Sequence, residues 1–359
     1  MNGLYIHIPF CVSKCFYCNF VSFKTSATTQ KKYIKELCAE IKNKKNLIKP
    51  KTLYIGGGTP SILTPALLEM LFKTIEKNFG PIKNFKESTL EANVESLTLA
   101  KLKLFKKYGF TRLSLGLQSP DNKYLKIIGR AHTWERFLKI YTIAKKYFEN
   151  INIDLIANLP IQTLADFSDG VKKVISLKPK HISLYALEIE SGCVLYQKGF
   201  STDDDLCLKM LKTATTLLEK AGYTQYEISN FSQKGAQSKH NINYWKNGSY
   251  LGLGLAASSY LKGVRSTNTA DLKKYLTAKN KTAFSEKLKG KAKEGEKIIL
   301  ALRMLDGFKP TKKMLQLFKE DFDSLIKQKL LISKQGKLAL TEQGKYLANE
   351  VFRHFVEPF

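Results

Sequence analysis

The chain has 359 residues, of which 43% are hydrophobic and 25% are charged. These values exclude global disorder and are sufficient for one large α/β domain with a smaller domain appended. The formal net charge is +28, but only six basic residues are arginines and the rest are lysines spread along the chain. Because recognition of phosphates and bases favours arginine, nucleic acid is not the expected partner, whereas association with a membrane surface stays open.

No targeting or membrane-spanning segment is expected. The first residues, MNGLYIHIPFCVSK, contain neither a basic stretch nor an apolar run of signal-peptide length. Nowhere do eighteen apolar residues follow one another, so no transmembrane helix is predicted. We therefore expect a cytoplasmic protein.

Strand-like and helical segments alternate from residue 2 to about residue 260. The predicted strands are Leu4–Ile8, Thr52–Ile55, Ser88–Ala92, Arg112–Leu117, Ile151–Ile156, His181–Leu187 and Tyr223–Ser229. Between them, helical periodicity indicates Thr29–Lys45, Pro65–Phe79, Ser96–Tyr108, Thr133–Tyr147, Thr163–Leu177 and Asp203–Lys220. This alternation predicts a parallel sheet with helical crossovers, closed into a complete or partial (β/α) barrel. Functional residues should then follow the carboxyl ends of the strands.

The chain changes character after about residue 265. Helices are predicted at Leu272–Lys279, Ala292–Leu305, Lys312–Phe318 and Phe322–Gln328. A β-hairpin over Leu330–Ser333 and Leu338–Leu340 precedes a last helix, Glu342–Phe355. The sequence thus predicts a barrel domain over residues 1–264 and a small helical, winged-helix-like domain over residues 265–359.

Three of the six cysteines, Cys11, Cys15 and Cys18, lie within eight residues directly after the first strand. Their spacing is C-x3-C-x2-C, and thiolates are the preferred ligands of iron–sulfur clusters. Three thiolates in one loop can bind three corners of a four-iron cluster and leave one iron open for another ligand. A structural zinc site is the weaker alternative, since it needs a fourth ligand, for which His7 is the nearest candidate. Three buried thiols without a metal are a weaker alternative still.

A glycine run and several polar residues follow later strands. Gly57, Gly58 and Thr59 come directly after the second strand, where a ligand can approach bare backbone, although a tight turn is the usual explanation for such a run. Polar candidates near later strand ends are Glu91, Gln118, Arg130 and Asp154. Each has a structural alternative, such as a helix cap, a turn, a surface pair or a hydrogen-bonded core carboxylate.

The cysteine spacing, with Tyr17 before the last cysteine, resembles the signature of the radical S-adenosylmethionine superfamily. The resemblance implies a 4Fe-4S cluster whose open iron chelates S-adenosylmethionine, which the cluster can cleave to a 5′-deoxyadenosyl radical. It also implies that the glycine segment contacts the methionine amino group. Longer matches are similar to the HemN/HemW family: LYIHIPFC, CFYCNF, GGGTPS, LSLGLQS, GRAH, IDLIANLP and HNINYW.

Site residues follow from this resemblance by motif. The positions that match contacts to S-adenosylmethionine are Tyr5, Gly57, Gly58, Thr59, Glu91, Gln118, Arg130 and Asp154. Tyr17 matches a position that, in the oxidase of the family, contacts a second such molecule.

Two features separate the branches of this family. The oxygen-independent coproporphyrinogen III oxidases carry a fourth cysteine where this chain has Phe20, and they have a long N-terminal extension. The resemblance therefore favours the haem-chaperone branch, whose members bind haem and pass it to recipients such as respiratory enzymes. His240, in HNINYW, is a candidate haem ligand, although a histidine that hydrogen-bonds a loop is an equal alternative. An oxidase and a nucleic-acid-associated radical enzyme are the rival functions, and a homodimer stays open.

Overall fold

The computed structural model describes residues 1–356, and one twelve-stranded sheet forms its centre. The strand order is β12-β11-β10-β9-β1-β2-β3-β4-β5-β6-β8-β7. The strands are β1 (Gly3–Ile8), β2 (Thr52–Gly57), β3 (Glu87–Ala92), β4 (Arg112–Gln118), β5 (Asn150–Ala157), β6 (His181–Ala186), β7 (Thr224–Glu227), β8 (Asn230–Ser232), β9 (Tyr250–Leu253), β10 (Ser258–Leu261), β11 (Val264–Asn268) and β12 (Thr282–Glu286). From β9 through β1 to β6 the neighbours are parallel, and both edges are antiparallel. The described strands form no closed barrel, which confirms the partial-barrel prediction.

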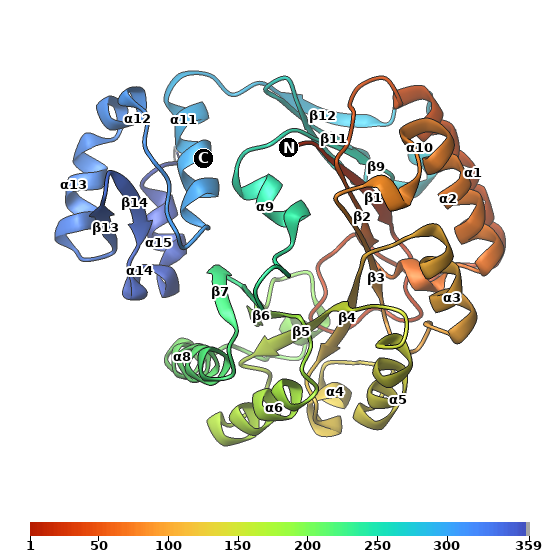
Figure 1. The fold of residues 1–359 in the computed structure, drawn as a ribbon, viewed down its shortest axis with the longest axis horizontal. Helices are drawn as coiled ribbons and strands as arrows, with labels where there is room; N and C mark the ends of the chain where they lie inside the picture. The colour runs from red at the N-terminus through yellow and green to blue at the C-terminus, as the bar shows by residue number, and fades with distance from the viewer. Residues whose placement is uncertain (357–359) are drawn as a thin grey trace.

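Helices cover the outer face of the curved sheet, whereas α9 lies within its curve (Figure 1). The helices that accompany the sheet are α1 (Ala27–Lys44), α2 (Pro65–Phe79), α3 (Leu99–Tyr108), α4 (Asn122–Ile127), α5 (Trp134–Ala144), α6 (Leu164–Ser176), α7 (Val194–Gln197), α8 (Asp204–Lys220), α9 (Lys239–Trp245) and α10 (Leu272–Thr277). Short 3-10 turns occupy η1 (Pro60–Ile62) and η2 (Ile82–Asn84). Most crossover helices begin at a Ser, Thr or Asp cap whose side chain accepts a backbone N–H, as Thr64 and Thr163 do.

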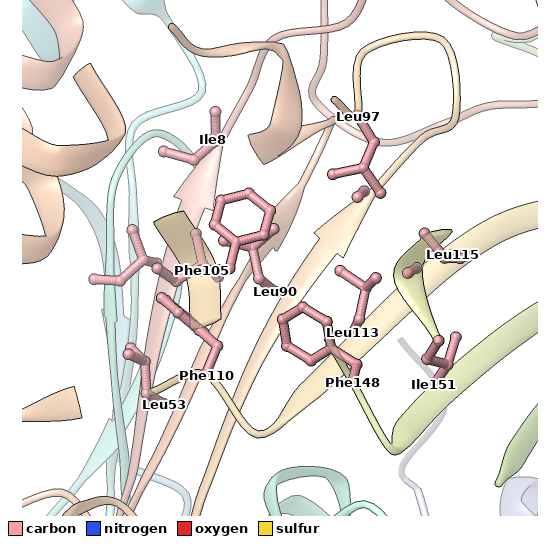
Figure 2. Packing of buried hydrophobic residues seen from close by; sticks show 14 of the residues in the cluster. Ile8, Leu53, Leu90, Leu97, Phe105, Phe110, Leu113, Leu115, Phe148 and Ile151 are labelled. Carbon is pink, nitrogen blue, oxygen red and sulfur yellow. The ribbon is translucent and has the colours of Figure 1, made fainter. Parts of the chain in front are cut away.

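The main core lies between the sheet and these outer helices. Figure 2 shows Leu53, Leu90 and Leu113 on neighbouring strands beside Phe105 and Phe110, all of them buried. Burial of each large apolar side chain stabilises the fold by about 1.5–3 kcal/mol. Because side chains alternate along a strand, the residues between these positions face the inside of the curve. There they are polar, and they form the site described below.

A second core joins the C-terminal elements (Figure 1). They are α11 (Gly290–Leu302), α12 (Lys312–Leu317), α13 (Lys319–Lys327), β13 (Leu331–Lys334), β14 (Lys337–Leu340), α14 (Glu342–Tyr346) and α15 (Ala348–Arg353). The antiparallel β13–β14 hairpin among helices confirms the winged-helix-like prediction. The single last helix was wrong, because Leu347, with φ −107° and ψ 27°, separates α14 from α15.

The expected domain boundary at residue 264 falls inside the main sheet. Strands β11 and β12 extend that sheet, and Tyr275 of α10 is buried in its core. Residues 265–286 therefore pack with the barrel, and the buried residues of the second core begin at Ile298. Within residues 1–356, no helix is both long and apolar enough to cross a bilayer.

Candidate functional site

A cavity of about 1290 Å³ lies on the inner side of the sheet. Its lining comes from the cysteine loop, the strands, α8 and the C-terminal elements. The structure brings these predicted site residues together there: Cys11, Cys15, Tyr17, Cys18, Gly57, Gly58, Thr59, Glu91, Gln118, Arg130 and Asp154. Tyr5 and His240 are the predicted site residues that do not line it.

The cysteine loop is anchored through Phe16. The backbone N–H of Phe16 donates to the Ile128 carbonyl at 3.0 Å, and the Phe16 carbonyl accepts from the Leu195 N–H at 2.9 Å. Its ring packs on Gly129, whose φ is +72° and where an added Cβ would lie 2.8 Å from the ring. Glycine is therefore required at this position both by conformation and by space.

We expect Gly129→Ala to loosen this loop. The substitution strains a left-handed backbone and forces the Phe16 ring away, at a combined cost of about 2 kcal/mol. The measurements are the free energy of unfolding and the iron content after anaerobic reconstitution, both of which should fall. Gly263→Ala is the matched control for backbone strain, since Gly263 also has a positive φ but no atom lies within 4 Å of its added Cβ. Equal iron content in the two variants would contradict the anchoring role of Phe16.

Each thiol of the loop contacts a different polar group. Cys11 Sγ lies 3.5 Å from Thr59 Oγ1, Cys18 Sγ lies 3.9 Å from Ser22 Oγ, and Arg130 Nη1 donates to Cys15 Sγ at 3.4 Å. No three Cys, His, Asp or Glu side chains of the described residues gather closely enough to bind one metal ion. All three cysteines line the cavity from one loop.

Glu91 links the glycine segment to the inside of the sheet. Its Oε2 accepts the Gly57 N–H at 3.1 Å, and its Oε1 accepts the Tyr54 hydroxyl at 2.5 Å. Burial raises the pKa of Glu91 to about 7, although the Tyr54 hydrogen bond lowers it. At Gly58, an added Cβ would lie 2.8 Å from the Phe10 carbonyl, so the glycine is needed where the two loops meet.

Arg130 and Asn93 connect the two loops. Arg130 Nη2 donates to Asn93 Oδ1 and to the Gly116 carbonyl, each at 2.8 Å, and Asn93 Nδ2 donates to Thr59 Oγ1 at 2.8 Å. The sequence analysis missed Asn93. Its position two residues after Glu91, at the end of the same strand, was a signal that could have identified it.

Asp154 and Gln118 lie on the neighbouring strands. Asp154 Oδ1 accepts from Asn152 Nδ2 at 2.7 Å, which satisfies the requirement that a buried carboxylate be hydrogen-bonded. Burial raises the pKa of Asp154. Gln118 has φ +73° at the end of β4, where the register with β5 shifts.

Tyr5 and His240 lie behind the cavity wall. The Tyr5 hydroxyl shares a hydrogen bond of 2.9 Å with His7 Nδ1. His240 is 1% exposed, with Nδ1 2.8 Å from Thr52 Oγ1 and Nε2 2.8 Å from the Tyr244 hydroxyl. Burial lowers the pKa of His240 to about 3, so the ring is neutral. In this conformation both ring nitrogens are engaged, as in the structural alternative, and the role of His240 as a haem ligand stays a prediction.

We expect His240→Ala to destabilise the fold. The change leaves the Thr52 and Tyr244 hydroxyls without their partner and removes a ring that packs against Tyr54 at a centroid distance of 5.3 Å. Loss of a buried network of this kind costs about 2–4 kcal/mol. Denaturant unfolding measures it, with the exposed Lys239→Ala on the same helix as control, for which we expect less than about 0.5 kcal/mol. A cost of that size at His240 would contradict a structural role.

Comparison with known proteins shows which class of protein has this fold and this cysteine loop. The model of the Radical SAM superfamily matches residues 5–174. The solved structure of coproporphyrinogen III oxidase (HemN) from Escherichia coli, described as a radical SAM enzyme, superimposes with a TM-score of 0.85. At 23% identity, over 99% of this chain and 89% of that one, it shows the fold alone.

Relatives with higher sequence identity show which family within this class the chain belongs to. The heme chaperone HemW of Lactococcus lactis subsp. lactis (strain IL1403) is 36% identical over 370 residues, which cover 99% of this chain and 97% of that protein. The heme chaperone HemW of Bacillus subtilis (strain 168) is 33% identical and is matched over 99% of both chains. The chain therefore belongs to the HemW family of the Radical SAM superfamily.

Proposed function

We propose that this chain is a haem chaperone that binds a 4Fe-4S cluster, S-adenosylmethionine and haem, and delivers haem to recipient proteins such as respiratory enzymes. The observation that carries the proposal is the single large cavity that contains the three cysteines together with the glycine, carboxylate and arginine groups. Its relatives from Lactococcus lactis and Bacillus subtilis, named heme chaperones, support the choice of cargo.

The donor set fits both cofactors. Cys11, Cys15 and Cys18 would bind three irons, and the cluster would supply an electron to the sulfonium of S-adenosylmethionine at its open iron. Glu91 and Asp154 would accept hydrogen bonds from the ammonium and ribose hydroxyls of that molecule, and Arg130 would attract its carboxylate. Gly57 and Gly58 also line the cavity, and their N–H groups donate to Glu91 and to the Ile8 carbonyl.

The rival function, oxidation of coproporphyrinogen, has less support. Phe20 occupies the position where the oxidases carry their fourth cysteine, and its side chain is 68% exposed at the cavity. A phenyl ring there offers neither a metal ligand nor an acid–base group. Association with a membrane surface and a homodimer stay predictions, whereas the scattered lysines still disfavour a nucleic-acid partner.

The test is a haem transfer assay. The protein, reconstituted anaerobically with iron and sulfide, is loaded with haem, separated from free haem and mixed with a haem-free respiratory oxidoreductase. We expect haem to bind the loaded protein and the recipient to gain haem absorption and activity. Incubation with coproporphyrinogen and S-adenosylmethionine should give no decarboxylated product. Turnover without haem binding would overturn the chaperone proposal in favour of the oxidase.

A further inference from the structure

Arginine is concentrated around the cavity. The chain has only six arginines among 59 basic residues, yet Arg112, Arg130 and Arg303 all line this space. Arg130 is occupied by its hydrogen bonds to Cys15, Asn93 and Gly116. The other two guanidinium groups are not used by the proposed cluster and S-adenosylmethionine contacts.

Arg112 is a buried cation without a bonded partner. It is 2% exposed, and its Nε is buried with no hydrogen-bond partner. Among residues 1–356 its side chain makes no hydrogen bond and no ion pair within 4.0 Å. The nearby carboxylates are bonded elsewhere, Glu91 to Tyr54 and Gly57 and Asp154 to Asn152. A buried charge left this way is costly, so the site favours an anion that enters from the cavity.

Arg303 reaches the same cavity from the other core. It caps the end of α11, and its backbone is fixed because the Ile228 N–H donates to the Arg303 carbonyl at 3.2 Å. Its guanidinium lies over the Trp245 ring at 4.3 Å from the centroid, and its Nε is buried and unpartnered. Glu227 is near enough for Arg303 to lower its pKa, which burial raises, but its oxygens accept from Asn230 and from the Ser229 N–H.

The remaining lining suits a large amphipathic ligand. Apolar side chains from α8 and from the C-terminal helices form the walls: Leu208, Leu211, Leu347 and Phe352. The volume of about 1290 Å³ exceeds that of an ordinary small-molecule pocket, about 300–1,000 Å³. Glu188, Glu190, Asp204 and Asp205 are exposed where they line the cavity. These carboxylates repel the carboxylates of a ligand, whereas the buried guanidinium of Arg112 and the half-buried guanidinium of Arg303 attract them.

We propose that Arg112 and Arg303 bind the two propionate carboxylates of haem, so that the macrocycle lies between α8 and the C-terminal helices. This inference rests on the proposed haem-chaperone function and locates its cargo. Planar guanidinium groups match carboxylates in two-pronged hydrogen bonds, and apolar walls match the porphyrin faces. Because one arginine belongs to the sheet and the other to the C-terminal unit, bound haem would join the two.

The experiment compares haem with haem dimethyl ester, in which both propionates are esterified and uncharged. Dissociation constants are measured by absorption titration for wild type, Arg112→Gln, Arg303→Gln and the double variant. We expect each single change to weaken haem binding by about 10–100-fold, as for loss of a charged hydrogen bond. Wild type should prefer haem to the ester by at least as much, and the double variant should bind both alike. Arg136→Gln, an exposed helix position, is the control and should match wild type.

The experiment distinguishes failure of this inference from failure of the proposed function. A double variant that still prefers haem to its ester, with wild-type affinity, would show that the propionates bind elsewhere and overturn this inference while the chaperone function stands. Failure of wild type to bind haem at all would overturn the proposed function and this inference with it. Circular dichroism checks folding, and if Arg112→Gln does not fold, Arg303→Gln with the ester comparison decides the result.

Discussion

Anaerobic reconstitution of Cys15→Ala with iron and sulfide is expected to leave the protein colourless, with less than about a tenth of the wild-type iron. Two thiolates bind a cubane far more weakly than three, and this change also removes the acceptor of the Arg130 Nη1 hydrogen bond. Binding of S-adenosylmethionine should fall with the iron, because its proposed chelation site is an iron of the cluster. Iron analysis, visible absorption and equilibrium binding measure the three effects.

Cys207→Ala is the matched control. Cys207 lines the same cavity, but it is buried and lies on α8 away from the loop. Burial raises the pKa of its thiol to about 11, so it stays protonated and is a poor iron ligand. We expect wild-type iron content in this variant. A full cluster in Cys15→Ala, or equal losses in both variants, would refute the assignment of the cysteine loop.

Glu91→Gln is expected to make the protein more stable and to weaken its binding of S-adenosylmethionine. Its pKa is about 7 in the folded protein, against an ordinary 4.5, because the carboxyl group is buried. Between these values the folded state binds more protons than the unfolded state, so the free energy of unfolding falls as pH rises through this window. Glutamine removes that penalty, and at pH 8 we expect a gain of about 2 kcal/mol together with about 100-fold weaker binding of S-adenosylmethionine.

The dependence of S-adenosylmethionine binding on pH distinguishes an effect of the Glu91 charge from a general loss of structure. In wild type, affinity for S-adenosylmethionine should fall as pH drops from 8 to 6, since the protonated carboxyl no longer attracts an ammonium group. The variant should lose this dependence. Glu87→Gln is the control: Glu87 is buried on the same strand but accepts from the Lys239 and His240 N–H groups outside the cavity. It should lose stability and retain affinity, and the reverse pattern would contradict the role of Glu91.

Much of the fold was predictable because its strands are short apolar runs between clear breaks. Strands β1 to β6 lie within one or two residues of their predicted bounds. Strands β9 to β12 were missed, since segments such as Gly252–Ser259 contain no β-branched or aromatic residue of the kind that marks a strand. These strands are stabilised by pairing with β1 and with each other, which local sequence does not encode.

Residues of the candidate site could be predicted where they belong to a sequence motif, but not where the fold alone brings them together. The cysteine and glycine loops were found because their spacing is specific. Arg112 and Arg303 were not, because a single arginine has no pattern and its lack of a partner is visible only in three dimensions. For His240 the motif left two roles open, and only the fold shows that Thr52 and Tyr244 lie against both its ring nitrogens.

If the cavity binds haem as proposed, the open edge of the sheet determines how the rigid porphyrin can leave it. In a closed barrel, sideways departure would require two paired strands to part and several ladder hydrogen bonds to break. Here that side of the cavity is lined by residues of α14 and α15, which contact it through side chains rather than by extending the sheet. Backbone hydrogen bonds from the Ile228 N–H to the Arg303 carbonyl and from the Leu305 N–H to the Tyr226 carbonyl tie the C-terminal unit to β7, so moving that unit aside would break these bonds but would part no pair of neighbouring strands in the sheet.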